Sequence, residues 1–103
     1  MNLNINLGPP VIVSPPSEVA LIPGSAIYFV PGVSVDLFFY DGYWWSPRGS
    51  RWYRAYEPNG PWVVVEHRYV PAPLFRVPRD YRVVYRGADR IPYGHWKRTH
   101  HGH

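Results

Sequence analysis

The sequence predicts an all-β fold: a small antiparallel meander that closes into an SH3-like barrel or a two-layer sheet, with a short C-terminal helix or tail. Residues 35–65 consist of four short apolar runs separated by three turn signals, which is the pattern of consecutive hairpins. Thirteen prolines and nine glycines among 103 residues favour short strands joined by fixed turns over long helices. Aromatic residues make up 17% of the chain, and their large buried areas help one small domain to form a core.

The first hairpin of the meander has the clearest signal. Asp41 and Gly42 suit a type I′ turn, because that turn needs positive φ at both central residues and matches the twist of the flanking strands. Residues that pair across a hairpin share a face of the sheet. The expected pairs are Tyr40 with Tyr43, Phe39 with Trp44, and Phe38 with Trp45.

Two longer loops extend the meander. A loop at residues 47–50 that joins Ser46 to Arg51 pairs Trp45 with Trp52 and Trp44 with Tyr53, and a loop at residues 57–61 brings Trp62 opposite Tyr56. A slip of one residue in either loop would exchange the faces, because side chains alternate along a strand. The predicted core face holds Val35, Leu37, Phe39, Trp44, Tyr53, Ala55, Val63 and Val65, with Ser46 and Arg51 at its margin. The predicted aromatic face holds Asp36, Phe38, Tyr40, Tyr43, Trp45, Trp52, Arg54, Tyr56, Trp62 and Val64.

The remaining segments divide the chain into three parts. Residues 1–17 form a proline-rich arm, residues 18–88 the β domain, and residues 89–103 a basic, His-rich helix or tail. We expect strands at residues 18–22, 26–30 and 81–86, and residues 66–70 as a prolongation of the last strand of the meander. A short helix is expected from Ile91 on, with Pro92 tolerated in its first turn.

Composition limits the functional classes. The net charge of +4 favours anionic partners such as nucleic acid, phospholipid head groups or an acidic envelope polymer, or else reflects an ordinary charged surface. The absence of cysteine excludes disulfides, thiol catalysis and Cys-ligated metals. No run reaches the roughly 20 apolar residues that span a bilayer. Ser46, Ser50 and Thr99 have no His and carboxylate in a recognisable arrangement, so we expect neither an enzyme nor a cofactor.

A resemblance to known proteins rests on the run FFYDGYWWSPRGSRWYRAYEPNGPWVVV, with YFVPGVSVD before it and RVPRDYR and RIPYGHWK after it. The segments DGYWW, WYRA, NGPWV and RIPYG are its most specific parts. The chain resembles small, uncharacterised, proline- and aromatic-rich exported proteins of the cell envelope in delta-type proteobacteria. That resemblance implies a processed, periplasmic or extracellular protein, with a leader upstream of a segment like NLNINLGPP, and offers no catalytic residues.

The predicted aromatic face is the first candidate site. Its proposed ligand-binding residues are Tyr40, Tyr43, Trp45, Trp52, Arg54, Tyr56 and Trp62. Such rings stack on sugars, grip extended proline-rich peptides or assemble with copies of the same chain, and Arg54 adds cation–π contacts or holds an anion. The alternative is a purely structural subunit, in which the chain's own proline-rich segments at residues 9–31 or 71–78 cover this face.

Two further sites are weaker candidates. His95, His100, His101 and His103 suit a transition metal, although their spacing fits no closed site and indicates weak binding only. Arginine interleaved with aromatic residues at positions 51–54 is typical of a sheet that binds single-stranded nucleic acid. The export implied by the resemblance disfavours nucleic acid as a partner. We therefore expect a non-enzymatic binding or assembly module.

Overall fold

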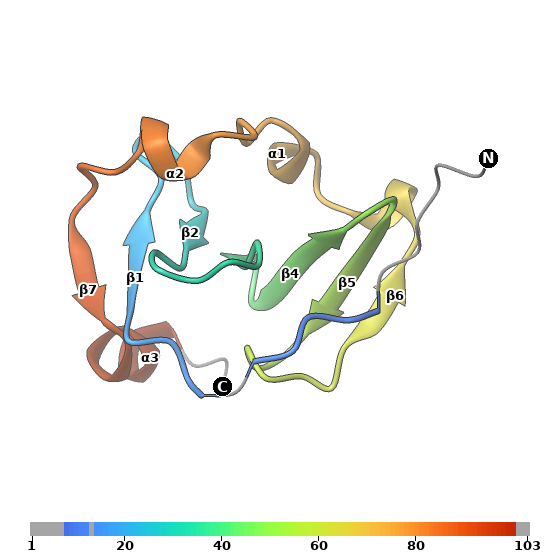
Figure 1. Cartoon of the computed structure of the whole chain (residues 1–103), viewed down its shortest axis with the longest axis horizontal. Helices are drawn as coiled ribbons and strands as arrows, with labels where there is room; N and C mark the ends of the chain where they lie inside the picture. The colour runs from blue at the N-terminus through green and yellow to red at the C-terminus, as the bar shows by residue number, and fades with distance from the viewer. Residues whose placement is uncertain (1–7, 13, 101–103) are drawn as a thin grey trace.

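The computed structural model describes residues 8–12 and 14–100, which form one antiparallel sheet with short helices on both sides (Figure 1). The strands are β1 (Glu18–Leu21), β2 (Tyr28–Phe29), β3 (Phe38–Tyr40), β4 (Tyr43–Arg48), β5 (Arg51–Ala55), β6 (Val63–Val65) and β7 (Arg90–Pro92). The helices are η1 (His67–Tyr69), α1 (Ala72–Phe75), α2 (Tyr81–Val84) and α3 (Tyr93–His100).

The seven strands of the described ranges lie in the order β6-β5-β4-β3-β2-β1-β7. The sheet is not closed, since β6 and β7 are its two ends, and the SH3-like barrel is not confirmed. The predicted antiparallel sheet with a short C-terminal helix is confirmed. Among the described residues, no helix combines the length and the apolar character that crossing a membrane requires.

The β3–β4 hairpin has the predicted register. Tyr40 pairs with Tyr43, and Phe38 with Trp45. Asp41 and Gly42 have φ angles of 54° and 83°, which are the positive values that a type I′ turn requires.

The β4–β5 hairpin differs from the prediction by two residues. Its loop is only Gly49 and Ser50, because β4 continues through Pro47 to Arg48. Trp45 therefore pairs with Arg54 rather than with Trp52, and Trp44 with Ala55 rather than with Tyr53. A shift of two residues preserves the side-chain alternation, so the predicted faces of these two strands hold.

The β5–β6 register differs from the prediction by one residue, which exchanges the faces of β6. Val65 pairs with Trp52, and Val64 with Tyr53. Trp62 packs against the cluster around Trp44 instead of joining the predicted aromatic face. The connection at residues 56–62 is too long to fix the register by itself. The register follows instead from Val65, which packs with Trp52 in the same buried cluster.

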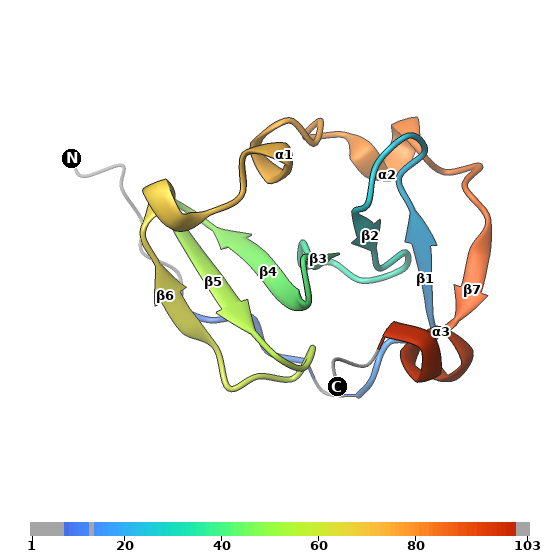
Figure 2. The ribbon, with the colours of Figure 1, turned by 180° about the vertical axis from the view of Figure 1, so that it is seen from behind.

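Two hydrophobic clusters lie on opposite sides of the sheet, and Figures 1 and 2 show α1 and α2 on one side and α3 on the other. The α1–α2 core contains Ala20, Ile22, Ile27, Phe29, Phe38, Trp45, Trp52, Val65, Val70, Leu74 and Tyr81. The α3 core contains Val19, Val30, Leu37, Trp44, Tyr93 and Trp96. Both faces of the sheet are therefore packed.

Three predicted strands change. Residues 67–69 form η1 instead of prolonging β6, which allows Val65 and Val70, with four residues between them, to enter the same core. Of the strand predicted at residues 81–86, residues 81–84 form α2 and Tyr85 caps it, because Tyr81 and Tyr85 are four positions apart and both pack against the α1–α2 core. The strand predicted at residues 26–30 is reduced to β2, whereas β1 and α3 are confirmed.

The end of the described chain is part of the sheet. β7 pairs with β1, so that Ile91 lies opposite Val19. Arg90 forms an ion pair with Glu18 at 3.4 Å. α3 follows directly and packs its buried residues against the sheet, which positions the helix for the site described next.

Candidate functional site

The predicted aromatic face is largely covered by the chain itself. Only 2% of the Trp45 surface and 8% of the Trp52 surface is exposed. Leu74 packs in the same cluster, and the ring centroid of Phe75 lies 5.3 Å from that of Trp52. Trp45 and Trp52 do not offer ring faces to solvent, which corrects the expectation of an open platform that includes them. The cover at residues 71–78 is one of the two that the sequence suggested.

Three residues of the predicted site remain together beside the hairpin turn. The Arg54 guanidinium lies 4.5 Å above the ring centroid of Tyr43, and the rings of Tyr43 and Tyr56 are 5.1 Å apart. A hydrogen bond with Tyr56 raises the pKa of the Tyr43 hydroxyl. Tyr56 is 74% exposed, whereas Tyr40 packs against the α1–α2 core and accepts the Trp45 indole N–H at its carbonyl, at 2.9 Å.

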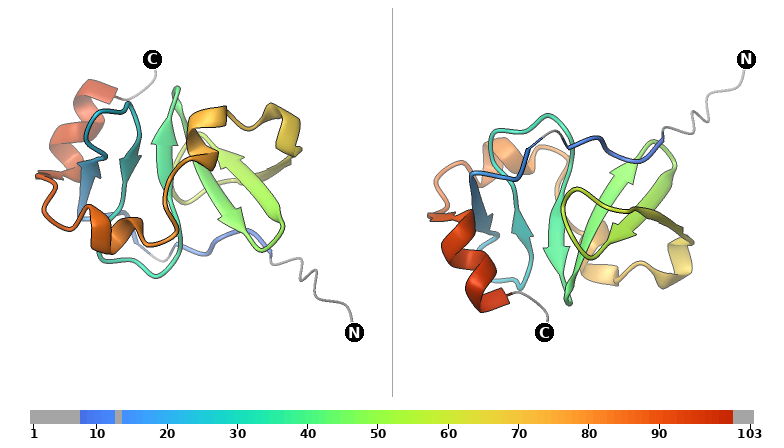
Figure 3. Two further views of the ribbon diagram at one scale, coloured as in Figure 1. Left: turned by 90° about the horizontal axis from the view of Figure 1, so that it is seen from above. Right: turned by 90° about the horizontal axis from the view of Figure 1, so that it is seen from below.

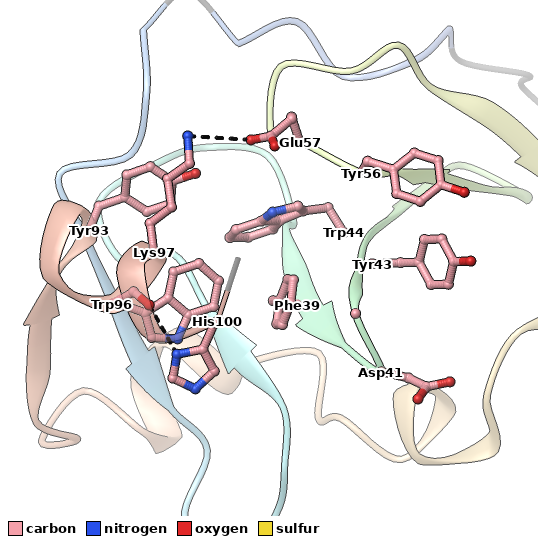
Figure 4. A pocket seen from close by; sticks show the side chains of 11 residues that line it. Phe39, Asp41, Tyr43, Trp44, Tyr56, Glu57, Tyr93, Trp96, Lys97 and His100 are labelled. Carbon is pink, nitrogen blue, oxygen red and sulfur yellow. Dashed lines mark hydrogen bonds and ion pairs between the residues drawn. The ribbon is translucent and has the colours of Figure 1, made fainter. Parts of the chain in front are cut away.

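A cleft of about 610 Å³ opens between the end of the β3–β4 hairpin, the chain after β5, and α3 (Figure 4). Six of its lining residues are aromatic: Phe39, Tyr43, Trp44, Tyr56, Tyr93 and Trp96. Four more lining residues are ionisable or charged: Asp41, Glu57, Lys97 and His100. Phe39 and Trp44 were predicted to belong to the core face only.

Trp96 is the centre of the ring contacts in the cleft. Its ring centroid lies 4.8 Å from Phe39 and 5.6 Å from Trp44, with both pairs edge to face. The His100 ring stacks on it at 4.9 Å with an interplanar angle of 10°. Trp44 and Trp96 are each only 2% exposed, so these rings form a fixed wall.

The spacing of residues on α3 creates this wall. Tyr93, Trp96, Lys97 and His100 recur every three or four residues, which puts them on one face of a helix. The His100 ring is held in place, because Nε2 lies 3.1 Å from the Tyr28 hydroxyl and Nδ1 lies 3.0 Å from the Trp96 carbonyl. This helical stripe is the sequence signal that could have identified the cleft.

An ion pair spans the cleft between α3 and the chain after β5. The Lys97 ammonium lies 3.7 Å from the Glu57 carboxylate, and the two side chains are 43% and 38% exposed (Figure 4). Burial, with a smaller contribution from the Glu57 charge, raises the pKa of Tyr93 to about 12. Tyr93 is therefore neutral at physiological pH.

The predicted metal ligands do not come together in the described part of the chain. His95 is exposed and lies 3.4 Å from an Arg98 nitrogen, whereas His100 belongs to the ring stack on Trp96. His101 and His103 lie outside the described residues. Among the described residues, no group of three or more His, Asp or Glu could hold a metal ion.

No protein-family model matches this chain, and neither a curated protein nor a solved structure shows significant similarity to it. The resemblance to exported envelope proteins stays a prediction. The aromatic cleft is the feature on which a function can rest.

Proposed function

We propose that the protein is a non-enzymatic binding module of the bacterial envelope or the extracellular space, and that its cleft holds a segment of an extended polymer, either a glycan or a peptide. The observation that carries the proposal is the cleft itself. Six aromatic residues line this opening of about 610 Å³. The opening of about 580 Å³ beside α1 and α2 has four, and the chain's own segment at residues 71–78 supplies four of its lining residues. The envelope location follows the family resemblance of the sequence.

The composition of the cleft suits a binding site better than a reactive one. Its volume lies within the range of about 300–1,000 Å³ that is common for ligand pockets, and such pockets are mainly apolar with a few polar groups that orient the ligand. Here the aromatic rings supply contact area, and Asp41, Glu57 and Lys97 supply charge. Because the ring contacts of Trp96 already fix the wall, little order is lost when a ligand binds.

The indole N–H signals in NMR spectra test this proposal, because tryptophans lie on both sides of the sheet. We expect a ligand from a panel of oligosaccharides and extended peptides to shift the signals of Trp44 and Trp96, which line the cleft. Trp45, which is 2% exposed in the α1–α2 core, serves as the internal control and should not move. Trp52 lines a separate cleft on that side, so a shift of Trp52 without Trp44 and Trp96 would place the ligand there. The proposal is wrong if no panel member at millimolar concentration perturbs Trp44 or Trp96.

A second candidate function is assembly with copies of the same chain through β6. Val63 and Val64 are 51% and 56% exposed on this end strand, and no other described strand pairs with its outer edge. An apolar edge strand is a template for another strand, whereas at the other end β7 contains Pro92 and the paired Arg90. An antiparallel β6–β6 pair centred on Val64 places no like charges opposite each other within the strand.

Sedimentation velocity tests the assembly. We expect the wild-type protein to form a dimer whose dissociation constant rises at least about tenfold in Val64→Lys, because a charged lysine on an edge strand opposes pairing. Val83→Lys is the matched control, since Val83 is similarly exposed but lies on α2. A wild-type protein that stays monomeric at millimolar concentration contradicts this candidate.

A further inference from the structure

The molecule covers its aromatic surfaces with proline-containing segments of its own chain. Residues 71–78 cover Trp45 and Trp52 on the α1–α2 side. On the α3 side, the described parts of the arm, residues 8–12 and 14–17, run along the molecule towards β1 (Figure 3), with Pro10 and Pro16 buried and Ile12 packed against the α3 core. A proline has a fixed φ, so an extended segment that contains prolines loses less conformational freedom when it is bound.

The cleft lies next to this arm. A second cavity, of about 220 Å³, lies beside the arm residues Ile12 and Pro15. It shares Glu57, Tyr93 and Lys97 with the cleft, so the two spaces adjoin at the ion pair. An extended segment in the cleft would therefore lie close to the arm, with the Glu57–Lys97 ion pair between them.

The way in which the rings are presented favours proline over sugar. Stacking of a sugar requires an open ring face, but Trp44 and Trp96 are 2% exposed and hold each other edge to face. Tyr56, at 74% exposure, is the most open ring at the rim. A proline side chain is small, packs between ring edges, and brings no N–H that needs an acceptor.

The charges of the cleft favour a basic residue in the ligand. Asp41 is exposed at the hairpin turn and forms no ion pair with a described residue, whereas Lys97 is already paired with Glu57. A cation on the ligand would give Asp41 a partner. Since the whole chain has a net charge of +4, this attraction is local to the cleft.

From these observations we infer that the cleft binds an extended, proline-containing peptide with one basic residue. This inference rests on the function proposed above and specifies its ligand.

Matched probe peptides test the inference by isothermal titration and by the indole NMR signals. The probe is the capped octapeptide PPLPRPPL, with PPLPEPPL as the charge control and GGLGRGGL as the proline control. We expect the probe to shift Trp44 and Trp96, PPLPEPPL to bind at least about threefold more weakly, and GGLGRGGL at least about tenfold more weakly. A β-1,4-linked N-acetylglucosamine hexamer should shift neither indole.

Three variants locate the binding. Tyr56→Ala should raise the dissociation constant of the probe peptide by about tenfold, because it removes the exposed ring at the rim of the cleft. Tyr69→Ala is the matched control, since Tyr69 is 62% exposed on η1 and does not line the cleft. Asp41→Asn should abolish the preference for PPLPRPPL over PPLPEPPL, and asparagine tolerates the φ of 54° at this position.

The possible results separate this inference from the proposed function. If the hexasaccharide shifts Trp44 and Trp96 and the peptides do not, the inference is wrong and the cleft remains a binding site. If neither class of probe shifts these indoles, both are wrong. If Tyr56→Ala leaves peptide binding unchanged, the peptide binds outside the cleft, and the inference is also wrong.

Discussion

The two faces of the sheet carry similar aromatic side chains but are covered differently. On the α1–α2 face, the continuous segment from Val70 to Tyr85 follows the sheet and seals Trp45 and Trp52. On the α3 face, one short helix contacts the sheet through a single stripe and leaves a cleft beside it. The α1–α2 cover also leaves a cleft, of about 580 Å³, which is lined by Trp52, Leu74 and Phe75 among others. The two clefts differ in their lining, because only the one beside α3 combines six aromatic residues with the Glu57–Lys97 ion pair.

The polar contacts of the two covers also differ. The Tyr81 hydroxyl donates to an Asp36 carboxylate oxygen at 2.8 Å, and the Arg82 guanidinium lies 3.1 Å from the same oxygen. Arg82 also donates to the Val35 carbonyl at 2.9 Å. The α3 cover relies on ring contacts, on the contact of His100 with the Tyr28 hydroxyl, and on the partly exposed Glu57–Lys97 ion pair. The first cover is anchored by several partly buried polar contacts around Asp36, and the second mainly by packing.

Removal of the central ring of the α3 face should have the largest effect on stability. Trp96→Ala should lower the free energy of unfolding by about 3–5 kcal/mol, because it deletes a buried indole that contacts Phe39, Trp44 and Tyr28. Urea denaturation followed by circular dichroism measures this loss. His95→Ala, at an exposed position of the same helix, should change stability by less than about 0.5 kcal/mol. A loss below about 1 kcal/mol for Trp96→Ala would mean that α3 is not part of the cooperative fold.

Removal of the apolar side chain that covers the other face should have a smaller effect. Leu74→Ala should lower the free energy of unfolding by about 2–4 kcal/mol and increase acrylamide quenching of tryptophan fluorescence, since Leu74 is 3% exposed in the α1–α2 core. Val83→Ala is the control on the same cover, at 59% exposure. Unchanged quenching in Leu74→Ala would show that this segment does not shield the indoles. The cleft ligand should bind Leu74→Ala as it binds the wild type.

Alkaline pH should weaken both covers through their buried tyrosines. Burial and the Asp36 carboxylate raise the pKa of Tyr81, and burial raises that of Tyr93 to about 12. Unfolded tyrosines ionise near pH 10, so the unfolded state binds fewer protons than the folded state above that pH. Stability should therefore be constant below about pH 10 and fall above it by up to about 1.4 kcal/mol per pH unit for each tyrosine.

Phenylalanine variants divide this effect between the faces. The urea midpoints at pH 9 and pH 11 should differ less in Tyr81→Phe and in Tyr93→Phe than in the wild type. Each variant removes one tyrosine whose ionisation in the unfolded state lowers stability at high pH. At neutral pH only Tyr81→Phe should lose stability, by about 1.5 kcal/mol, since it removes a hydrogen bond to a carboxylate. An unchanged alkaline slope in both variants would assign the pH dependence to other groups.

The sequence predicted those parts of the molecule that short-range chemistry determines. Asp41 and Gly42 set the first hairpin, because a two-residue turn that needs positive φ leaves one register. The separation of Trp44 from Trp45 onto opposite faces follows directly from that register. The short helix expected from Ile91 on is present as α3, but it begins at Tyr93, since Ile91 and Pro92 belong to β7 and not to a first helical turn.

Other parts depend on contacts between distant segments, and local patterns predicted them poorly. Residues 81–84 have the composition of a strand, but the space above Phe29 and Phe38 selects a helix that brings Tyr81 into contact with both rings. The cleft was missed because it joins α3 to the β3–β4 hairpin. The spacing of residues from Tyr93 to His100 on one helix face could have been recognised in the sequence. The pairing of β7 with β1, which brings α3 to the sheet, could not.

The smallest effect should come from the ion pair that spans the cleft. A double-mutant cycle of Glu57→Gln and Lys97→Met should give a coupling energy below about 1 kcal/mol that falls further at 1 M salt, because both side chains are partly exposed at a separation of 3.7 Å. Methionine retains the aliphatic stem of Lys97, so the cycle reports on charge. The Glu18–Arg90 pair is the matched control, since its side chains have similar exposure and it joins β1 to β7. If the Glu57–Lys97 coupling instead exceeds that control by more than about 1 kcal/mol, the pair anchors α3 to the chain after β5, and α3 covers its face as firmly as residues 70–85 cover the other.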